Sequence, residues 1–139
     1  QDFNWIRNVT NKMLKVLLFF TFITIVLGLI SPWVYPIWTL GKVEVPHTLT
    51  VLLGIYIFVI IFSLYFAHIL YGIGKIFVQT IVTLCEAILF IPLALYLAKI
   101  WGVEGIIIAL IIVNLPCAIT NVIQYNKILQ GNAHGIWNK

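Results

Sequence analysis

The sequence predicts an all-α membrane protein with four transmembrane helices. Of its 139 residues, 63% are hydrophobic and only 9% are charged, whereas a soluble domain needs about 25% charged residues at its surface. Charged and turn-forming residues divide the chain into four apolar stretches, each long enough for the roughly 20 residues that cross a hydrocarbon core. No ten-residue alternation of apolar and polar side chains indicates a transmembrane barrel. We therefore expect one membrane domain over residues 1–139.

The first apolar stretch follows a polar segment with apolar side chains interspersed. Residues 1–15 are expected to lie along the membrane surface as an amphipathic segment. The first helix is expected over about 16–38. Pro32, Pro36 and Gly41 mark its end, because proline has no N–H for the helical hydrogen bond and glycine favours a turn.

The other expected helices are separated by breaks that contain glycine. Gly72 and Gly74 separate the second helix from the third, and Trp101-Gly102 separates the third from the fourth. The second, third and fourth helices are expected over about 47–71, 76–98 and 104–126. Residues 127–139 are expected to form a cytoplasmic tail.

The lysines and arginines predict the orientation. An even number of crossings places both termini on one side, together with most of the cationic residues, whereas only Lys42 and Lys99 lie on the other side. Such an excess marks the cytoplasmic side of a multi-pass protein. The charge indicates topology and contact with membrane lipid rather than a nucleic-acid partner. The cationic residues on the expected cytoplasmic side are Arg7, Lys12, Lys15, Lys75, Lys127 and Lys139.

The turn at Gly72-Ile73-Gly74-Lys75 lacks the spacing and the hydroxyl residue of a nucleotide-binding loop. Its surroundings, ILYGIGKIFVQ, are instead similar to a turn between late helices of polysaccharide flippases. These are the O-antigen and teichoic-acid type translocases of the multidrug/oligosaccharidyl-lipid/polysaccharide (MOP) exporter superfamily. WVYPIWTLGKVEVP resembles the short external loop of that family. KIWGVEGIIIA, with Gly102 and Gly105, resembles the entry to its final helix, and QYNKILQGNAHGIWNK resembles its cytoplasmic ending.

The resemblance implies a function and a location. The chain would be the C-terminal part of a translocator that flips polyprenyl-linked oligosaccharide, a precursor of cell-surface polysaccharide such as the O-antigen of lipopolysaccharide. It would lie in the bacterial inner (plasma) membrane, would not be an enzyme and would need no cofactor. Family members have twelve to fourteen helices in two bundles, so these four would act with upstream helices of the same chain. Those upstream helices would also supply the cations that pair with pyrophosphate, because the four apolar stretches contain no Lys or Arg.

Glu86 is the main candidate for a functional residue. It lies near the middle of the third expected helix, where a carboxylate ionised toward lipid costs several kcal/mol. It must therefore face protein or water, or be protonated. It is either a coupling site for a proton or cation, or a contact to the sugar, or a protonated carboxyl that bonds to Asn114, Asn121 or His68 on a neighbouring helix.

The fourth expected helix has a polar face formed by Asn114, Asn121 and Gln124. Amides of this kind either join helices or line a cavity, and the spacing leaves both roles open. His68, one turn before Gly72, is either an interfacial residue or part of a proton relay. Gly72, Gly74 and Lys75 are expected to form the cytoplasmic turn, with the lysine at the level of the lipid headgroups.

Two other functions remain open. The chain is alternatively a complete four-helix multidrug-type transporter that acts as a dimer with Glu86 as its coupling carboxylate, or a structural membrane subunit. A membrane enzyme would need a nucleophile or metal set, such as paired carboxylates or His-x-x-x-x-Asp, whereas the apolar stretches contain one carboxylate and no such pair. Cys85 and Cys117 have no spacing that suits a disulfide framework or a metal site, so both are interpreted as small buried apolar residues.

Overall fold

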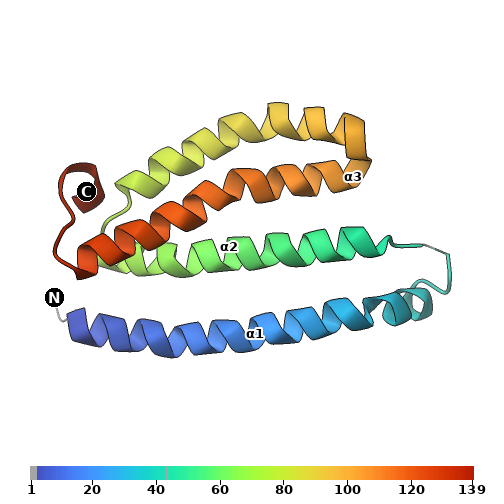
Figure 1. Ribbon diagram of the computed structural model, residues 1–139, viewed down its shortest axis with the longest axis horizontal. Coiled ribbons are helices and arrows are strands. Elements are labelled where there is room, and N and C mark those ends of the chain that lie inside the picture. Colours follow the sequence, from blue (N-terminus) through green and yellow to red (C-terminus); the bar gives the residue numbers. More distant parts are fainter. Residues whose placement is uncertain (1–2, 43) are drawn as a thin grey trace. The chain divides into compact units, whose positions relative to one another are not determined.

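The computed structural model describes residues 3–42 and 44–139, and within them it is all helical without any strand. Three long helices, α1 (Phe3–Trp38), α2 (His47–Ile73) and α3 (Phe77–Leu129), are followed by a short 3₁₀ helix, η1 (Gly135–Asn138) (Figure 1). All three long helices have the length and apolar composition to cross a membrane. The structure therefore confirms the prediction of an all-α fold, with three helices that are long and apolar enough to span a membrane.

The chain divides into two compact units, Gln1–Ile55 and Tyr56–Lys139. The first unit contains α1 and the beginning of α2. The second contains the remainder of α2, all of α3 and η1. Every residue of the candidate site lies in the second unit.

In the first unit, α1 is one continuous helix of 36 residues. It begins at Phe3, so the segment predicted to be a separate amphipathic piece belongs to the same helix as the first apolar stretch. It also continues through Pro32 and Pro36. Pro32 leaves the carbonyl of Gly28 without its helical N–H donor, and the Ser31 hydroxyl donates to that carbonyl instead, at 2.7 Å.

The turn between α2 and α3 is a Schellman motif. The N–H of Lys75 donates to the Leu70 carbonyl at 2.9 Å, and the N–H of Gly74 donates to the Tyr71 carbonyl at 3.0 Å. This pair of bonds needs a left-handed residue after the helix, and Gly74 supplies it with φ +81°. The predicted turn therefore has a clear backbone cause.

Helix α3 reverses direction at Gly102, whose backbone is non-helical with φ 60° and ψ −134°. Its N-terminal limb (77–101) and C-terminal limb (103–129) lie side by side and antiparallel (Figure 1). Close approach of the limbs depends on Gly105, because a Cβ there would lie 2.5 Å from the carbonyl carbon of Leu97. Ala94, Leu97 and Ala109 form the adjacent buried cluster.

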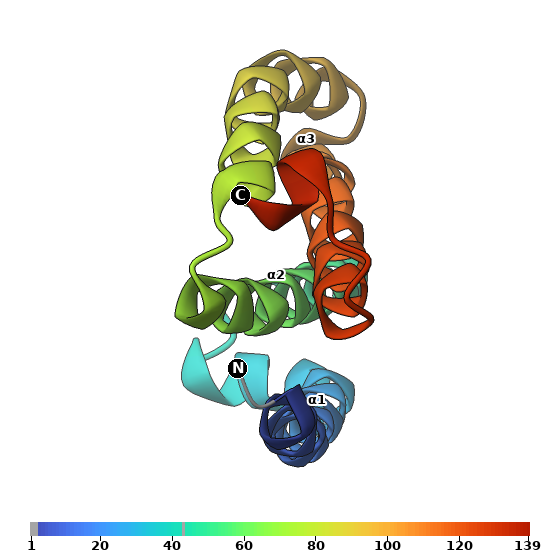
Figure 2. The same cartoon turned by 90° about the vertical axis from the view of Figure 1, so that its left-hand side faces the viewer.

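The two limbs of α3 are in register along their length. Leu97 with Gly105 and Ala94 with Ala109 are pairs that lie at nearly equal sequence distances on either side of the hairpin tip. α2 packs on the C-terminal limb through Phe66, whose ring centroid is 5.3 Å from that of Tyr125. Seen end-on, η1 lies across the limb ends that adjoin the α2–α3 turn (Figure 2).

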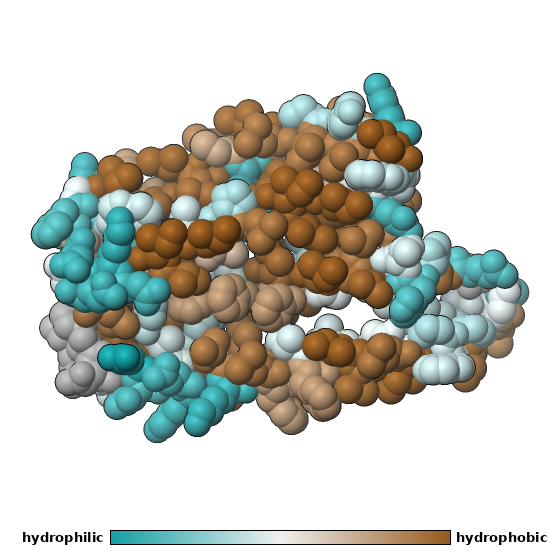
Figure 3. Space-filling view, viewed as in Figure 1, coloured by the Kyte–Doolittle hydropathy of each residue, from teal (hydrophilic) through white to brown (hydrophobic). Residues whose placement is uncertain are grey.

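The surface of the helices is apolar along their middle. Figure 3 shows hydrophobic side chains over the central part of the α3 limbs and polar side chains toward the limb ends. In the most apolar part of α3, 33% of the residues are buried, whereas in the most apolar part of α1 only 6% are buried. The exposed apolar side chains of α1 thus require lipid or other helices around them.

Candidate functional site

Asn121 is the centre of a buried polar cluster between α2 and α3. Its side chain is fully buried, and its Nδ2 donates to the Ser63 carbonyl and to the Ser63 hydroxyl, each at 3.2 Å. The same nitrogen lies 3.6 Å from the Cys117 thiol one turn earlier. A carbonyl only accepts hydrogen bonds, so the Asn121 nitrogen must face Ser63. The other amide atom, Oδ1, is buried and has no hydrogen-bond partner among the described residues.

Glu86 reaches this cluster from the N-terminal limb of α3. Its carboxyl group interacts with the backbone amide and the thiol of Cys117 on the opposite limb. Thr83, one turn before Glu86, also contacts that thiol. One carboxyl oxygen of Glu86, Oε1, is buried without a partner in the described part of the chain. Cys117 thus joins Glu86 to Asn121.

A second pair of amides lies nearer the α2–α3 turn. Gln124 is fully buried, and its Nε2 donates to the Trp137 carbonyl at 3.1 Å and to the Lys75 carbonyl at 3.4 Å. Gln79 on the N-terminal limb is only 7% exposed. Within the described residues, the Oε1 atoms of Gln79 and Gln124 both lack a hydrogen-bond partner.

The register of the α3 limbs relates these residues to one another. Glu86 and Cys117 lie at nearly equal sequence distances from the hairpin tip, and Gln79 and Gln124 have the same relation. On one limb Gln79 and Glu86 are two helical turns apart, and on the other Asn121 and Gln124 are about one turn apart, so each pair shares a face. We call Gln79, Glu86, Asn121 and Gln124 the acceptor row.

The C-terminal segment covers the end of the acceptor row. Lys75 Nζ donates to the Asn138 carbonyl at 2.6 Å, and the N–H of Phe77 donates to the Lys139 carbonyl at 3.3 Å. Lys127 Nζ lies 4.0 Å from the ring centroid of Trp137, a cation–π contact. These contacts hold η1 against the beginning of α3 and place the Trp137 carbonyl on Gln124.

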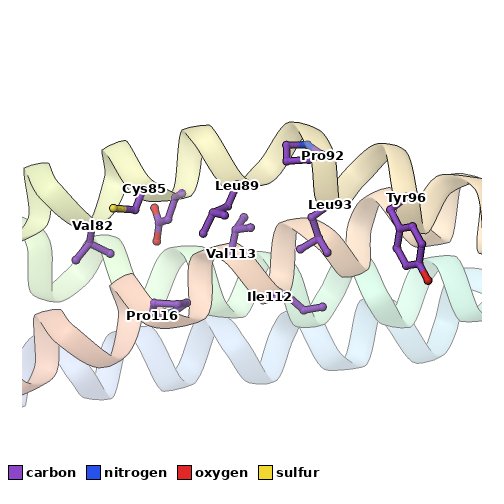
Figure 4. A pocket seen from close by; sticks show the side chains of 10 residues that line it. Val82, Cys85, Leu89, Pro92, Leu93, Tyr96, Ile112, Val113 and Pro116 are labelled. Carbon is purple, nitrogen blue, oxygen red and sulfur yellow. The ribbon is translucent and has the colours of Figure 1, made fainter.

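A groove of about 530 Å³ runs between the two limbs of α3 beside Glu86. Figure 4 shows the side chains that face it from both limbs. Apart from Glu86, the groove is predominantly apolar, and Pro92 and Pro116 lie on opposite limbs. The lining residues are Val82, Cys85, Glu86, Leu89, Pro92, Leu93, Tyr96, Ile112, Val113 and Pro116.

Two residues selected from the sequence make hydrogen bonds within their own helices. Asn114 donates from Nδ2 to the Leu110 carbonyl of its own helix at 2.8 Å. His68 is exposed; its Nδ1 lies 2.6 Å from the Leu64 carbonyl, and its ring contacts Tyr71 edge-on. Of the three partners considered for Glu86, the structure brings Asn121 close, through Cys117.

Three participants were not selected from the sequence as site residues: Gln79, Cys117 and Trp137. Gln79 could have been found, since it lies seven residues before Glu86 and hence on the same helical face. Cys117 is buried as expected, whereas Cys85 is exposed, so the prediction of burial was wrong for Cys85. Cys117 also contacts polar groups on two helices. Its role depends on the register of the hairpin, which spacing alone does not reveal.

The arrangement favours hydrogen-bond donors that are not side chains of this chain. The unpartnered atoms of the acceptor row are all oxygens, and oxygen acceptors bind water, protons or small cations. No group of three or more His, Cys, Asp or Glu with the geometry of a metal site occurs in the described residues. Comparison of the chain with protein-family models, curated proteins and solved structures finds no match.

Proposed function

We propose that the chain is part of a membrane translocator that flips polyprenyl-linked oligosaccharide, the precursor of a cell-surface polysaccharide, across the bacterial inner membrane. The observation that carries this proposal is the acceptor row, buried in a unit whose helices are apolar enough to span a membrane. Polar and ionisable groups at such depth are costly and typically mark the path of a substrate or ion.

The row combines hydrogen bonds that join segments with oxygens left available to other donors. Asn121 and Gln124 donate through nitrogen to the carbonyls of Ser63, Lys75 and Trp137. Bonds of this kind between helices contribute roughly 0.5–2 kcal/mol each. The oxygens of both amides have no partner among the described residues, which supports a role in binding in addition to packing.

The resemblance to polysaccharide flippases supports the substrate class. The glycines at its motif positions have structural roles, since Gly74 closes a Schellman turn and Gly102 and Gly105 form a tight hairpin. In this proposal each limb of α3 crosses the membrane once, which gives four crossings with α1 and α2. Both termini and the Gly72–Lys75 turn then lie in the cytoplasm, as the cationic residues favour.

Residue roles follow from position. Glu86, Asn121 and Gln124 belong to the polar interior, with Glu86 as the coupling group, whereas Asn114 and His68 bond within their own helices. The described lysines of the second unit lie in or near helix ends and turns, so upstream helices of the same chain supply the cations for the pyrophosphate. The partners are membrane lipid and the lipid-linked oligosaccharide.

Complementation tests the proposal. The full-length native protein that contains this segment is expressed in cells that lack their own polysaccharide flippase, and surface polysaccharide and retained lipid-linked precursor are measured. We expect the wild type and Glu44→Gln, a control in the α1–α2 loop, to restore surface polysaccharide. Glu86→Gln should restore at least about tenfold less, as expected for loss of a coupling carboxyl. Absence of rescue by the wild type in every polysaccharide background would contradict the substrate class.

The groove beside Glu86 favours one second candidate, a multidrug-type transporter that acts as a dimer. An apolar groove with a single carboxylate suits a lipophilic cation, because burial of the apolar groups and charge pairing act together. The test is the binding of tetraphenylphosphonium to the chain in detergent. Saturable binding that Glu86→Gln abolishes would favour this function. Absence of binding would favour the flippase function instead. Failure of both tests would favour a structural subunit.

A further inference from the structure

Three lysine side chains meet on the C-terminal segment, at the end of the second unit that contains the α2–α3 turn. Lys75 Nζ donates to the Asn138 carbonyl at 2.6 Å. Lys127 Nζ lies 4.0 Å from the ring centroid of Trp137. Lys139 Nζ lies 5.5 Å from the centroid of the phenylalanine ring that begins α3. The contacts fall on consecutive positions, so three ammonium groups are held at one short stretch of chain. We call Lys75, Lys127 and Lys139 the lysine cluster.

The acidic side chains of the second unit lie away from the lysine cluster. The unit contains two of them, Glu86 and Glu104. Glu104 follows the hairpin tip at Gly102, at the opposite ends of the limbs, and Glu86 lies about 14 Å along α3 from its first residue. The three ammonium groups instead contact a carbonyl and two aromatic rings, which carry no net charge. The cluster therefore keeps its positive charge for a ligand.

The ammonium groups also remain accessible. An ammonium has three N–H donors, of which Lys75 uses one on the Asn138 carbonyl. Lys139 is exposed, and the other two lysines are partly exposed. A ligand with several negatively charged oxygens can thus accept hydrogen bonds from more than one lysine while the contacts to the C-terminal segment persist.

The place of the lysine cluster on the unit indicates the kind of ligand. η1 lies across the limb ends (Figure 2), where polar side chains replace the hydrophobic surface of the limb centres (Figure 3). Within η1, Ile136 is 51% exposed and directly precedes Trp137. Tryptophan is typical of the boundary between membrane and water. An exposed apolar side chain beside three ammonium groups suits a molecule that has both an anionic group and hydrocarbon chains.

We propose that the lysine cluster binds the phosphate of an anionic phospholipid, with Ile136 against the adjoining part of the lipid chains. Lysine binds phosphate as a compact point charge, and basic sites between transmembrane helices bind anionic lipid headgroups. A free phosphate offers the same oxygens but no hydrocarbon for Ile136, so the ligand is a lipid. The proposal goes beyond the proposed function, because the cluster binds this lipid whether or not the chain moves a substrate.

Lipid binding is measured by native mass spectrometry of the full chain in neutral detergent, titrated with phosphatidylglycerol or with phosphatidylcholine. Each lysine close to an anionic headgroup strengthens binding about fivefold. With three lysines we expect phosphatidylglycerol to saturate one site per chain, at least about tenfold more tightly than phosphatidylcholine. Equal affinity for the two lipids would overturn the proposal. Millimolar inorganic phosphate, at constant ionic strength, should not displace the lipid; displacement would assign the site to a free phosphate and overturn the choice of a lipid.

Matched variants locate the site. Lys127→Gln should weaken the binding of phosphatidylglycerol about fivefold, whereas Lys99→Gln, an exposed lysine near the hairpin tip, should leave it unchanged. Equal affinities of these two variants would overturn the location. Lys127→Arg keeps the charge and should bind within about twofold of the wild type; a loss as large as that of Lys127→Gln would overturn the role of charge. If Lys127→Gln does not fold, Lys139→Gln makes the same test at an exposed position. The readout involves no translocation, so its failure is distinct from failure of the proposed function.

Discussion

The hairpin within α3 depends on the absence of a side chain at Gly105. A Cβ at this position would lie 2.5 Å from the carbonyl carbon of Leu97, closer still to its oxygen, and 3.0 Å from the nitrogen of Ala98. Those atoms belong to the backbone and cannot rotate away. In Gly105→Ala the two limbs must separate, and Glu86 then moves away from Cys117. The variant therefore tests whether the polar cluster depends on the hairpin.

The expected loss of stability can be worked out from the contact. Overpacking of a tight interior typically costs about 1–3 kcal/mol. The added Cβ would contact both the carbon and the oxygen of the Leu97 carbonyl, so we expect a cost at the upper end, about 3 kcal/mol. Alanine is favoured over glycine in a helix by up to about 1 kcal/mol. The net loss in the free energy of unfolding is then about 2 kcal/mol, roughly 30-fold in the folding equilibrium constant.

The assay is equilibrium unfolding in mixed micelles of increasing sodium dodecyl sulfate content, followed by circular dichroism. Gly54→Ala is the matched control, because it lies within α2 and a Cβ there meets no atom within 4 Å. The control should be unchanged or more stable by up to about 1 kcal/mol. Equal unfolding midpoints for Gly105→Ala and Gly54→Ala would refute the close approach of the limbs.

Three further variants probe the hairpin tip, the polar cluster and the C-terminal segment. Gly102→Ala should cost about 1–3 kcal/mol in the same unfolding assay, because its backbone is in a region that L residues avoid; an unchanged midpoint would contradict the turn. Asn121→Leu should cost about 1–2 kcal/mol through loss of both bonds to Ser63, with Asn126→Leu, which is exposed, as its unaffected control. Trp137→Ala removes the contact with Lys127 and should expose residues 130–139 to protease several times faster, since ordered backbone resists cleavage; an unchanged cleavage rate would show that the contact does not hold the segment.

The sequence was sufficient for the fold class. Long apolar stretches predict membrane-spanning helices because lipid cannot satisfy exposed backbone groups, and the structure has such helices. The glycine positions also indicated the turns, since left-handed backbone at Gly74 and Gly102 is a local property. Proline was less informative. Pro32 and Pro36 lie inside α1, and the Ser31 hydroxyl donates to the Gly28 carbonyl that Pro32 leaves without its helical donor.

The candidate site was predictable only in part. Glu86, Asn121 and Gln124 stand out in the sequence because polar groups are rare in apolar helices, and each of them has a buried oxygen without a hydrogen-bond partner in the described part of the chain. Their relation to one another depends on the register of the α3 limbs, which the close approach at Gly105 determines. For the same reason a cysteine interpreted as apolar connects Glu86 to Asn121. The Trp137 contact to Gln124 joins positions 13 residues apart through a turn, which helical periodicity does not predict.

The movement of substrate between leaflets tests the central claim most directly. The full-length native protein is reconstituted in liposomes with a fluorescent polyprenyl pyrophosphate-linked oligosaccharide, and the fraction protected from an external quencher is followed with time. The account predicts exchange between leaflets with the wild-type protein and with Glu44→Gln, and exchange at least about tenfold slower with Glu86→Gln. Equal exchange by wild-type protein and empty liposomes would contradict the account.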